Sequence, residues 1–96
     1  MKALLIIFNI AITDKIMKIL KNNELYAYTL IEKIKGKGLY GEPHFGTHTW
    51  PELNSAIFTV AKKENIINAF KELKNLDKEL PKFGIKAYVF DVFDYF

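Results

Sequence analysis

Cysteine, arginine and glutamine are all missing from this chain of 96 residues. The lack of cysteine excludes a disulfide framework, a thiolate nucleophile and a cysteine zinc site, and it favours a cytoplasmic protein. The 14 basic residues are all lysines, and the net charge is only +3. Since proteins that read nucleic-acid sequence depend on arginine for bidentate contacts to guanine, we do not expect a nucleic-acid partner.

Long apolar runs are also missing. The longest follows Met1-Lys2 and reads ALLIIFNIAI, which looks like the core of a signal peptide, but no A-x-A-like cleavage site comes after it. A run of this length is too short to span a bilayer. We therefore expect a buried first strand and a protein that is not embedded in a membrane.

Hydrophobic periodicity predicts strands and helices in the order β-α-β-β-α-β. The first helix follows an N-cap at Thr13 or Asp14 and stops at Asn22-Asn23. The strands are predicted at residues 2–9, 25–35, 55–61 and 85–93, and the second helix at residues 64–76. This order is typical of the α+β ferredoxin-like fold, a four-stranded antiparallel sheet with two helices on one face. The chain length indicates that residues 1–96 form a single domain.

The apolar content exceeds what a small monomer buries. Half of the residues are hydrophobic and 15% are aromatic. A sheet face without helices needs a partner, and the aromatic end Phe93-Asp94-Tyr95-Phe96 would add an exposed patch. The sequence therefore predicts a homo-oligomer.

The segment from Lys35 to Asn54 reads KGKGLYGEPHFGTHTWPELN and differs in composition from the rest. It holds four of the five glycines, two of the three prolines, both histidines and the one tryptophan. A connection of about twenty residues without regular structure is uncommon and is usually functional or disordered. Pro43, Phe45 and Trp50 argue against disorder, so we expect the function to reside in this long loop, residues 36–54.

Glycines at the start of the loop match the letters G-x-G-x-x-G, from Gly36 to Gly41. A dinucleotide fingerprint requires a helix directly afterwards, and Pro43 with the polar and aromatic residues behind it predicts none. Gly36 and Gly38 instead expose backbone N–H groups that can hold an anion. The alternative is that they serve only the bend at the loop base.

Lysines gather at the ends of two predicted strands. Lys33, Lys35 and Lys37 alternate, which predicts that they project to one side, and Lys82 and Lys86 begin the last strand. These strands are the two edges of the predicted sheet, so the two groups would meet across a subunit boundary and form a phosphate pocket. The alternative is that they are solvated edge lysines, which discourage strand pairing.

The two histidines, His44 and His48, lie close to Glu42 and Glu52. Imidazole and carboxylate ligands suit zinc, nickel or copper. In a straight segment the histidines would be about 13 Å apart, so the loop would have to bend or a second subunit contribute a ligand. The alternative is that both histidines hydrogen-bond within a folded loop.

No hydrolytic or transferase motif is present. Ser55, the single serine, lies in a predicted strand without a G-x-S-x-G context. Asp91 and Asp94 have no partner motif. We therefore do not expect an enzyme.

Nearly the whole chain resembles the PII nitrogen-regulatory signalling proteins. Besides the order of elements, the resemblance rests on Glu32-Lys33-Ile34-Lys35-Gly36-Lys37-Gly38 and on Gly84-Ile85-Lys86-Ala87-Tyr88-Val89-Phe90. The K-G-x-G motif looks like the base of the family's T-loop, and residues 41–54 look like a shortened variant in a divergent branch.

The resemblance implies a non-enzymatic trimer that binds an adenine nucleotide, ATP or ADP, in clefts between subunits. The long loop would contact a protein target such as a transporter or an enzyme. The ligand-binding residues would be Lys35, Gly36, Lys37, Gly38, Gly84 and Lys86. The family often also binds 2-oxoglutarate with magnesium, but the glutamine after its glycines is missing here. The alternative is a resemblance to the CutA proteins, trimers of the same architecture, in which the loop histidines would bind a divalent transition metal.

Overall fold

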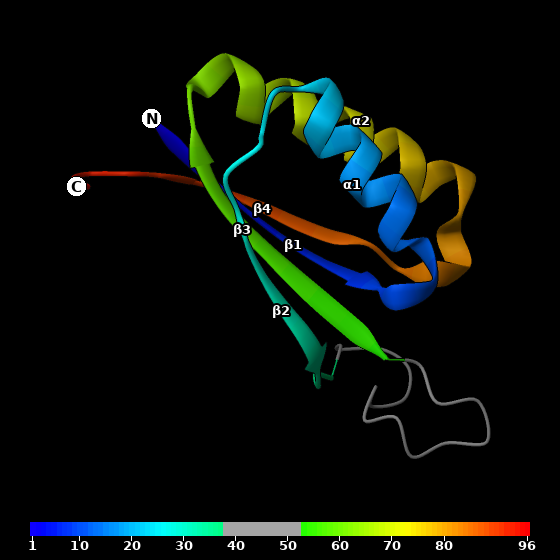
Figure 1. The fold of residues 1–96 in the computed structure, drawn as a ribbon. Coiled ribbons are helices and arrows are strands. Elements are labelled where there is room, and N and C mark those ends of the chain that lie inside the picture. The colour runs from blue at the N-terminus through cyan, green and yellow to red at the C-terminus, as the bar shows by residue number, and fades with distance from the viewer. Residues whose placement is uncertain (38–52) are drawn as a thin grey trace.

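The computed structural model describes residues 1–37 and 53–96 and has the predicted order of elements (Figure 1). The strands are β1 (Lys2–Asn9), β2 (Thr29–Ile34), β3 (Asn54–Ala61) and β4 (Lys86–Asp91). The helices are α1 (Thr13–Asn22) and α2 (Lys63–Glu79), and the short 3-10 turns η1 (Ile10–Ile12) and η2 (Pro81–Phe83) follow β1 and α2. The ferredoxin-like prediction is confirmed.

The four strands form one antiparallel sheet in the order β2-β3-β1-β4. β1 is apolar along nearly its whole length because neighbouring strands pair with both of its edges and helices cover one of its faces. β2 and β4 are therefore the edge strands. Residues 35–53 connect β2 with β3.

Both helices lie on the same face of the sheet (Figure 1). Side chains of β1 alternate between the faces, and Leu4, Ile6 and Phe8 point into the layer under the helices, where they are almost completely buried. Each helix adds one apolar stripe to this core. The buried members are Ile16, Ile19 and Leu20 from α1 and Ile66, Ala69, Leu73 and Leu76 from α2.

Two element ends differ from the prediction for physical reasons. β4 ends at Asp91 and not at Phe93, because the register pairs Asp91 with Lys2 at the start of β1 and the residues after it extend past the sheet. α2 continues beyond Leu76 to Glu79, because no helix-breaking residue occurs before Pro81. Proline disfavours helical backbone at the residue that precedes it, so the helix stops there. Among the residues that the structure describes, no helix is long and apolar enough to cross a membrane.

Glu24 ends α1 in a backbone conformation that favours glycine. Its φ is 58°, and the N–H groups of Glu24 and Leu25 donate to the carbonyls of Lys21 and Leu20 at 3.1 and 2.9 Å. These two bonds form a Schellman motif, which stops the helix and turns the chain. Because the motif carries Leu25 into the core, the strand predicted from Leu25 starts only at Thr29.

We expect Glu24→Gly to stabilise the protein by about 0.5 to 1 kcal/mol, because glycine adopts left-handed φ without a clash at Cβ. Glu24→Ala is the matched control, since alanine keeps Cβ and removes only the carboxylate. Urea unfolding at one protein concentration measures both variants. If the two variants unfold at the same urea concentration, the left-handed backbone is not a source of strain.

Candidate functional site

The lysines of the predicted phosphate pocket begin at a β-bulge in β2. The register of β2 against β3 shifts between Ile31 and Ile34, and Lys33 lies in this bulge with a left-handed φ of 57°. The prediction that Lys33, Lys35 and Lys37 alternate toward one side is therefore wrong. The bulge interrupts the two-residue period, and the strand ends before Lys35.

The segment after the bulge is open. Lys35, Gly36 and Lys37 are exposed. Among the residues that the structure describes, no atom lies within 4 Å of the position that a Cβ at Gly36 would take, so their packing does not require glycine there. Gly38, which was predicted to belong to the same group, lies outside the described residues.

The second half of the predicted pocket is the turn between α2 and β4. Gly84 ends η2 with a left-handed φ of 61°. The Ile85 N–H donates to Asp77 Oδ1 on α2 at 3.1 Å, which fixes the turn against the helix. Lys86 follows at the start of β4 and is exposed, and as the cross-strand partner of Ile7 it lies on the helix-free face.

One chain does not bring these two groups together. Lys86, Ile7, Ala56 and Ile31 form a cross-strand row that runs from β4 to β2. With strands about 4.8 Å apart, the two edge strands lie about 14 Å from each other. Lys35 lies still farther along β2 than Ile31, so a pocket that uses both Lys86 and Lys35 requires two chains.

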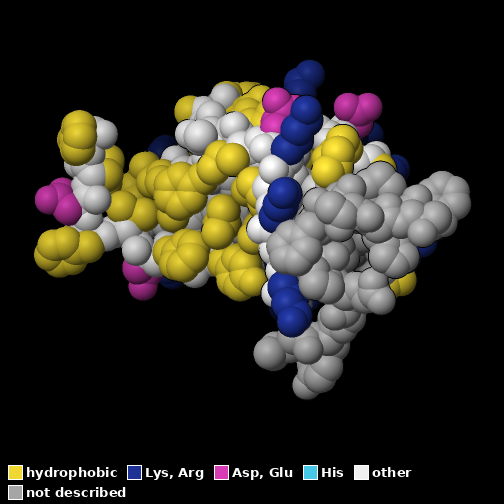
Figure 2. Space-filling model, turned by 90° about the horizontal axis from the view of Figure 1, so that it is seen from below, with side chains coloured by type: hydrophobic (Ala, Val, Ile, Leu, Met, Phe, Trp, Pro, Cys, Tyr) yellow, Lys and Arg dark blue, Asp and Glu magenta, His cyan; other side chains and the backbone are white. Residues whose placement is uncertain are grey.

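The helix-free face of the sheet is apolar. Figure 2 shows hydrophobic side chains gathered on this face. One cross-strand row consists of Thr29, Phe58, Leu5 and Tyr88, and Phe58 and Tyr88 are 42% and 47% exposed. Phe90 on the same face is equally exposed. A contiguous apolar patch on a small chain marks an interaction surface.

A groove lies at the free edge of β4, between this strand and α2. Its volume is about 220 Å³, and Lys74 Nζ lies 5.5 Å from the centre of the Phe70 ring at its side. Phe70 lies in the helix predicted at residues 64–76 and is half-buried. The lysine four residues later is the signal that could have placed it at the boundary with solvent. The groove is lined by Phe70, Leu73, Lys74, Asp77, Ile85, Lys86, Ala87 and Tyr88.

The metal ligands suggested by the sequence are not part of the described structure. Glu42, His44, His48 and Glu52 all lie within residues 38–52. In residues 1–37 and 53–96, no cluster of three or more histidine and acidic side chains could hold a metal ion. A metal site in the loop therefore stays a prediction.

An ion pair joins the far end of β4 to β1. Lys2 Nζ donates a hydrogen bond to Asp91 Oδ1. This bond, together with the nearby positive charge, holds the pKa of Asp91 below its usual value. The pair lies at the opposite end of β4 from Lys86 and contributes nothing to the candidate pocket.

Comparison with known proteins shows a shared fold without a matching sequence. No protein-family model and no curated protein matches the chain. The nitrogen regulatory PII-like protein CPII from Thiomonas intermedia, solved with ADP, AMP and bicarbonate, is 18% identical, with a TM-score of 0.77 over 95% of this chain and 84% of that chain. A protein from Thermus thermophilus described as PII-like and signalling is 20% identical, with a TM-score of 0.70 over 95% and 85%. The resemblance predicted from the sequence is thus confirmed for the fold, and this chain has the architecture of the PII-like proteins.

Proposed function

We propose that this protein is a PII-like regulatory protein that forms a homotrimer and binds an adenine nucleotide, ATP or ADP, between its subunits. The observation that carries the proposal is the position of two anion-binding groups at opposite edges of one sheet. The exposed residues Lys35, Gly36 and Lys37 follow β2, and Lys86 begins β4. Neither group forms a pocket alone.

A closed ring of subunits would bring the two groups together. When each subunit sets one surface against a different surface of the next, the contact is heterologous, and a ring results if the rotation closes. In the proposed ring, such contacts would set the β2 end of one subunit beside the β4 start of its neighbour. The apolar helix-free face supplies the surface that association would bury.

The chemistry of the two groups suits phosphate. Backbone N–H groups near Gly36 can donate to phosphate oxygens, and the ammonium groups of Lys35, Lys37 and Lys86 supply positive charge and donors. The related fold of CPII has been solved with ADP and AMP, which supports the choice of an adenine nucleotide. Residues 36–54 would then report the bound state to a protein target, and the protein itself would catalyse no reaction.

We expect Lys86→Ala to weaken ADP or ATP binding by about 1 to 3 kcal/mol, the usual cost of losing a charge-assisted hydrogen bond. Lys15→Ala is the matched control, because Lys15 is an exposed lysine on α1, in the helix layer (Figure 1) and not on the helix-free face where Lys86 lies. Isothermal calorimetry on the assembled protein measures both affinities.

Two results would contradict this proposal. One is a wild-type protein that shows neither heat nor a thermal shift with millimolar nucleotide. The other is equal nucleotide affinity of the Lys86→Ala and Lys15→Ala variants, which would remove Lys86 from the site.

A further inference from the structure

The groove between α2 and β4 is too small for a nucleotide. Its volume of about 220 Å³ lies below the range of roughly 300 to 1,000 Å³ that is typical of small-molecule sites. Leu73, Ile85 and Ala87 give it an apolar lining, and it opens at an unpaired strand edge. A groove with this size and lining suits one aromatic side chain.

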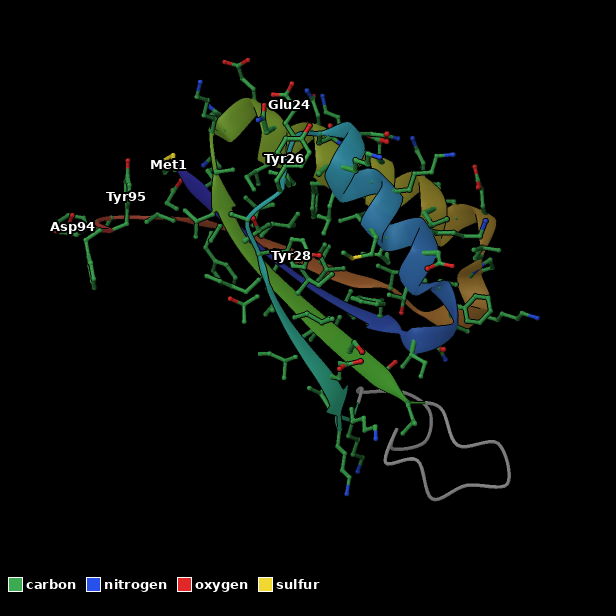
Figure 3. All side chains as sticks on the ribbon, viewed as in Figure 1. Met1, Glu24, Tyr26, Tyr28, Asp94 and Tyr95 are labelled. Atoms are coloured by element: carbon green, nitrogen blue, oxygen red, sulfur yellow. The ribbon has the colours of Figure 1, made fainter. Side chains whose placement is uncertain are left out.

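The chain itself supplies unburied aromatic side chains in the tail, residues 92–96. Only the start of the tail is joined to the sheet by a backbone hydrogen bond, in which the Val92 N–H donates to the Met1 carbonyl at 3.4 Å. Beyond it the chain projects past the sheet (Figure 1), and Asp94 and Tyr95 lie away from the body of the molecule (Figure 3). Phe93 and Phe96 are fully exposed.

The tail is poorly placed to fill the groove of its own chain. The tightest hairpin has a two-residue loop, and with Val92 and Phe93 in that loop, Asp94 would lie directly opposite Asp91, where like charges repel. Phe96 would then lie level with Val89, at the edge of the groove, whose β4 residues are Lys86 to Tyr88. A tail that occupies this groove therefore belongs to another copy of the chain.

Charge also favours this occupant. Asp94 is the one charged residue of the tail. Lys74 stands at the side of the groove, whereas the carboxylate of Asp77 already accepts the Ile85 N–H. In an extended segment residues two apart share a side, so Asp94 would face the groove together with Phe96.

We propose that the tail of one subunit docks in the α2–β4 groove of a neighbouring subunit, with Phe96 inside the groove and Asp94 paired with Lys74. The inference rests on the proposed function only because both require that subunits assemble. No nucleotide takes part in the docking of the tail. Docking of this kind covers two features that one chain leaves open, the aromatic tail and the edge of β4.

Disulfide trapping tests this contact, because the natural chain has no cysteine. Because Asp94 and Phe96 would face the groove, Tyr95 between them would face the other side of β4, where Tyr88 lies. Protein carrying Tyr88→Cys, at the edge of the groove, is mixed with protein carrying Tyr95→Cys, in the tail, and oxidised. We expect a disulfide-linked pair of the two variants. The matched control replaces Tyr88→Cys with Ala11→Cys, at an exposed alanine outside the groove, and should give no linked pair above background.

Two further variants test the individual contacts. Adding Phe96→Ser to the Tyr95→Cys protein should lower the trapping yield about tenfold if Phe96 is the anchor. Adding Asp94→Lys should lower it as well, and introducing Lys74→Asp into the groove protein should restore it. Failure of this charge exchange to restore the yield would overturn the pairing of Asp94 with Lys74.

Light scattering on the same samples separates the possible failures. A trimer in which groove and tail cysteines link no better than the control overturns the docked tail and leaves the proposed nucleotide function standing. A single-chain mass overturns both the docked tail and the trimer. Nucleotide affinity, measured separately on the wild-type protein, decides the proposed function independently of the tail.

Discussion

Replacing Phe58 with glutamate should convert the proposed trimer into single chains without unfolding them. Phe58 lies near the centre of the helix-free face, in a row with Leu5 and Tyr88, and is 42% exposed in one chain. A carboxylate there remains hydrated in the single chain, but in the assembly it would be buried without a partner, at a cost of several kcal/mol. Light scattering at micromolar concentration measures the mass, and circular dichroism checks the fold.

Tyr26→Glu is the matched control for this prediction. Tyr26 is also an exposed aromatic residue, 69% accessible, but it lies beside the end of α1 (Figure 3) and not on the helix-free face. We expect this variant to keep the wild-type mass. If Phe58→Glu also keeps that mass, the helix-free face is not the subunit interface.

Phe8→Ala should lower the free energy of unfolding by about 3 to 5 kcal/mol, the range for removing a buried aromatic side chain. Phe8 is 1% exposed and packs in the core between the sheet and the helices. Because a chain of this size has a total stability of about 5 to 15 kcal/mol, the variant should be close to unfolding at room temperature. Urea unfolding at one fixed protein concentration gives the value, since assembly also contributes to the apparent stability.

Ile10→Ala serves as the control for Phe8→Ala. Ile10 follows β1 by one residue and is 45% exposed, so its truncation should change the free energy of unfolding by no more than about 0.5 kcal/mol. Equal losses in the two variants would mean that Phe8 is not part of the core.

The order of elements was predictable because the apolar patterns are strong. The apolar run at residues 2–9 predicted β1 with the bounds that the structure has, and hydrophobic periodicity predicted a helix at residues 64–76, which lies within α2. Short-range signals located these elements because each one buries a continuous set of side chains.

Element ends that depend on tertiary register were not predictable. β4 was expected to continue to Phe93, but its pairing with β1 ends at Asp91, and no local signal in the sequence encodes the length of a neighbouring strand. The β-bulge at Lys33 is similar, since lysine is not a residue type that marks a left-handed position. This bulge is the reason why the predicted alternation of the lysines failed.

The candidate site was predicted in its residue types but not in its surroundings. Lys35, Gly36 and Lys86 were identified from charge and glycine spacing, and the structure places them at the ends of the two edge strands, as the predicted topology required. The α2–β4 groove was not predicted, because it forms between residues far apart in the sequence. Such a groove becomes visible only when the helix is placed against the strand.

Native mass spectrometry of the protein mixed with ADP tests the proposed function most directly, because it reports subunit number, bound nucleotide and bound metal in one spectrum. We expect a complex of three times the chain mass of 11.1 kDa, carrying ADP whose bound fraction falls in the Lys86→Ala variant and is unchanged in the Lys15→Ala variant. A single-chain mass, or a trimer that binds no ADP at millimolar concentration, would contradict the proposal. A trimer that carries a transition metal in place of nucleotide would support the alternative site at the loop histidines.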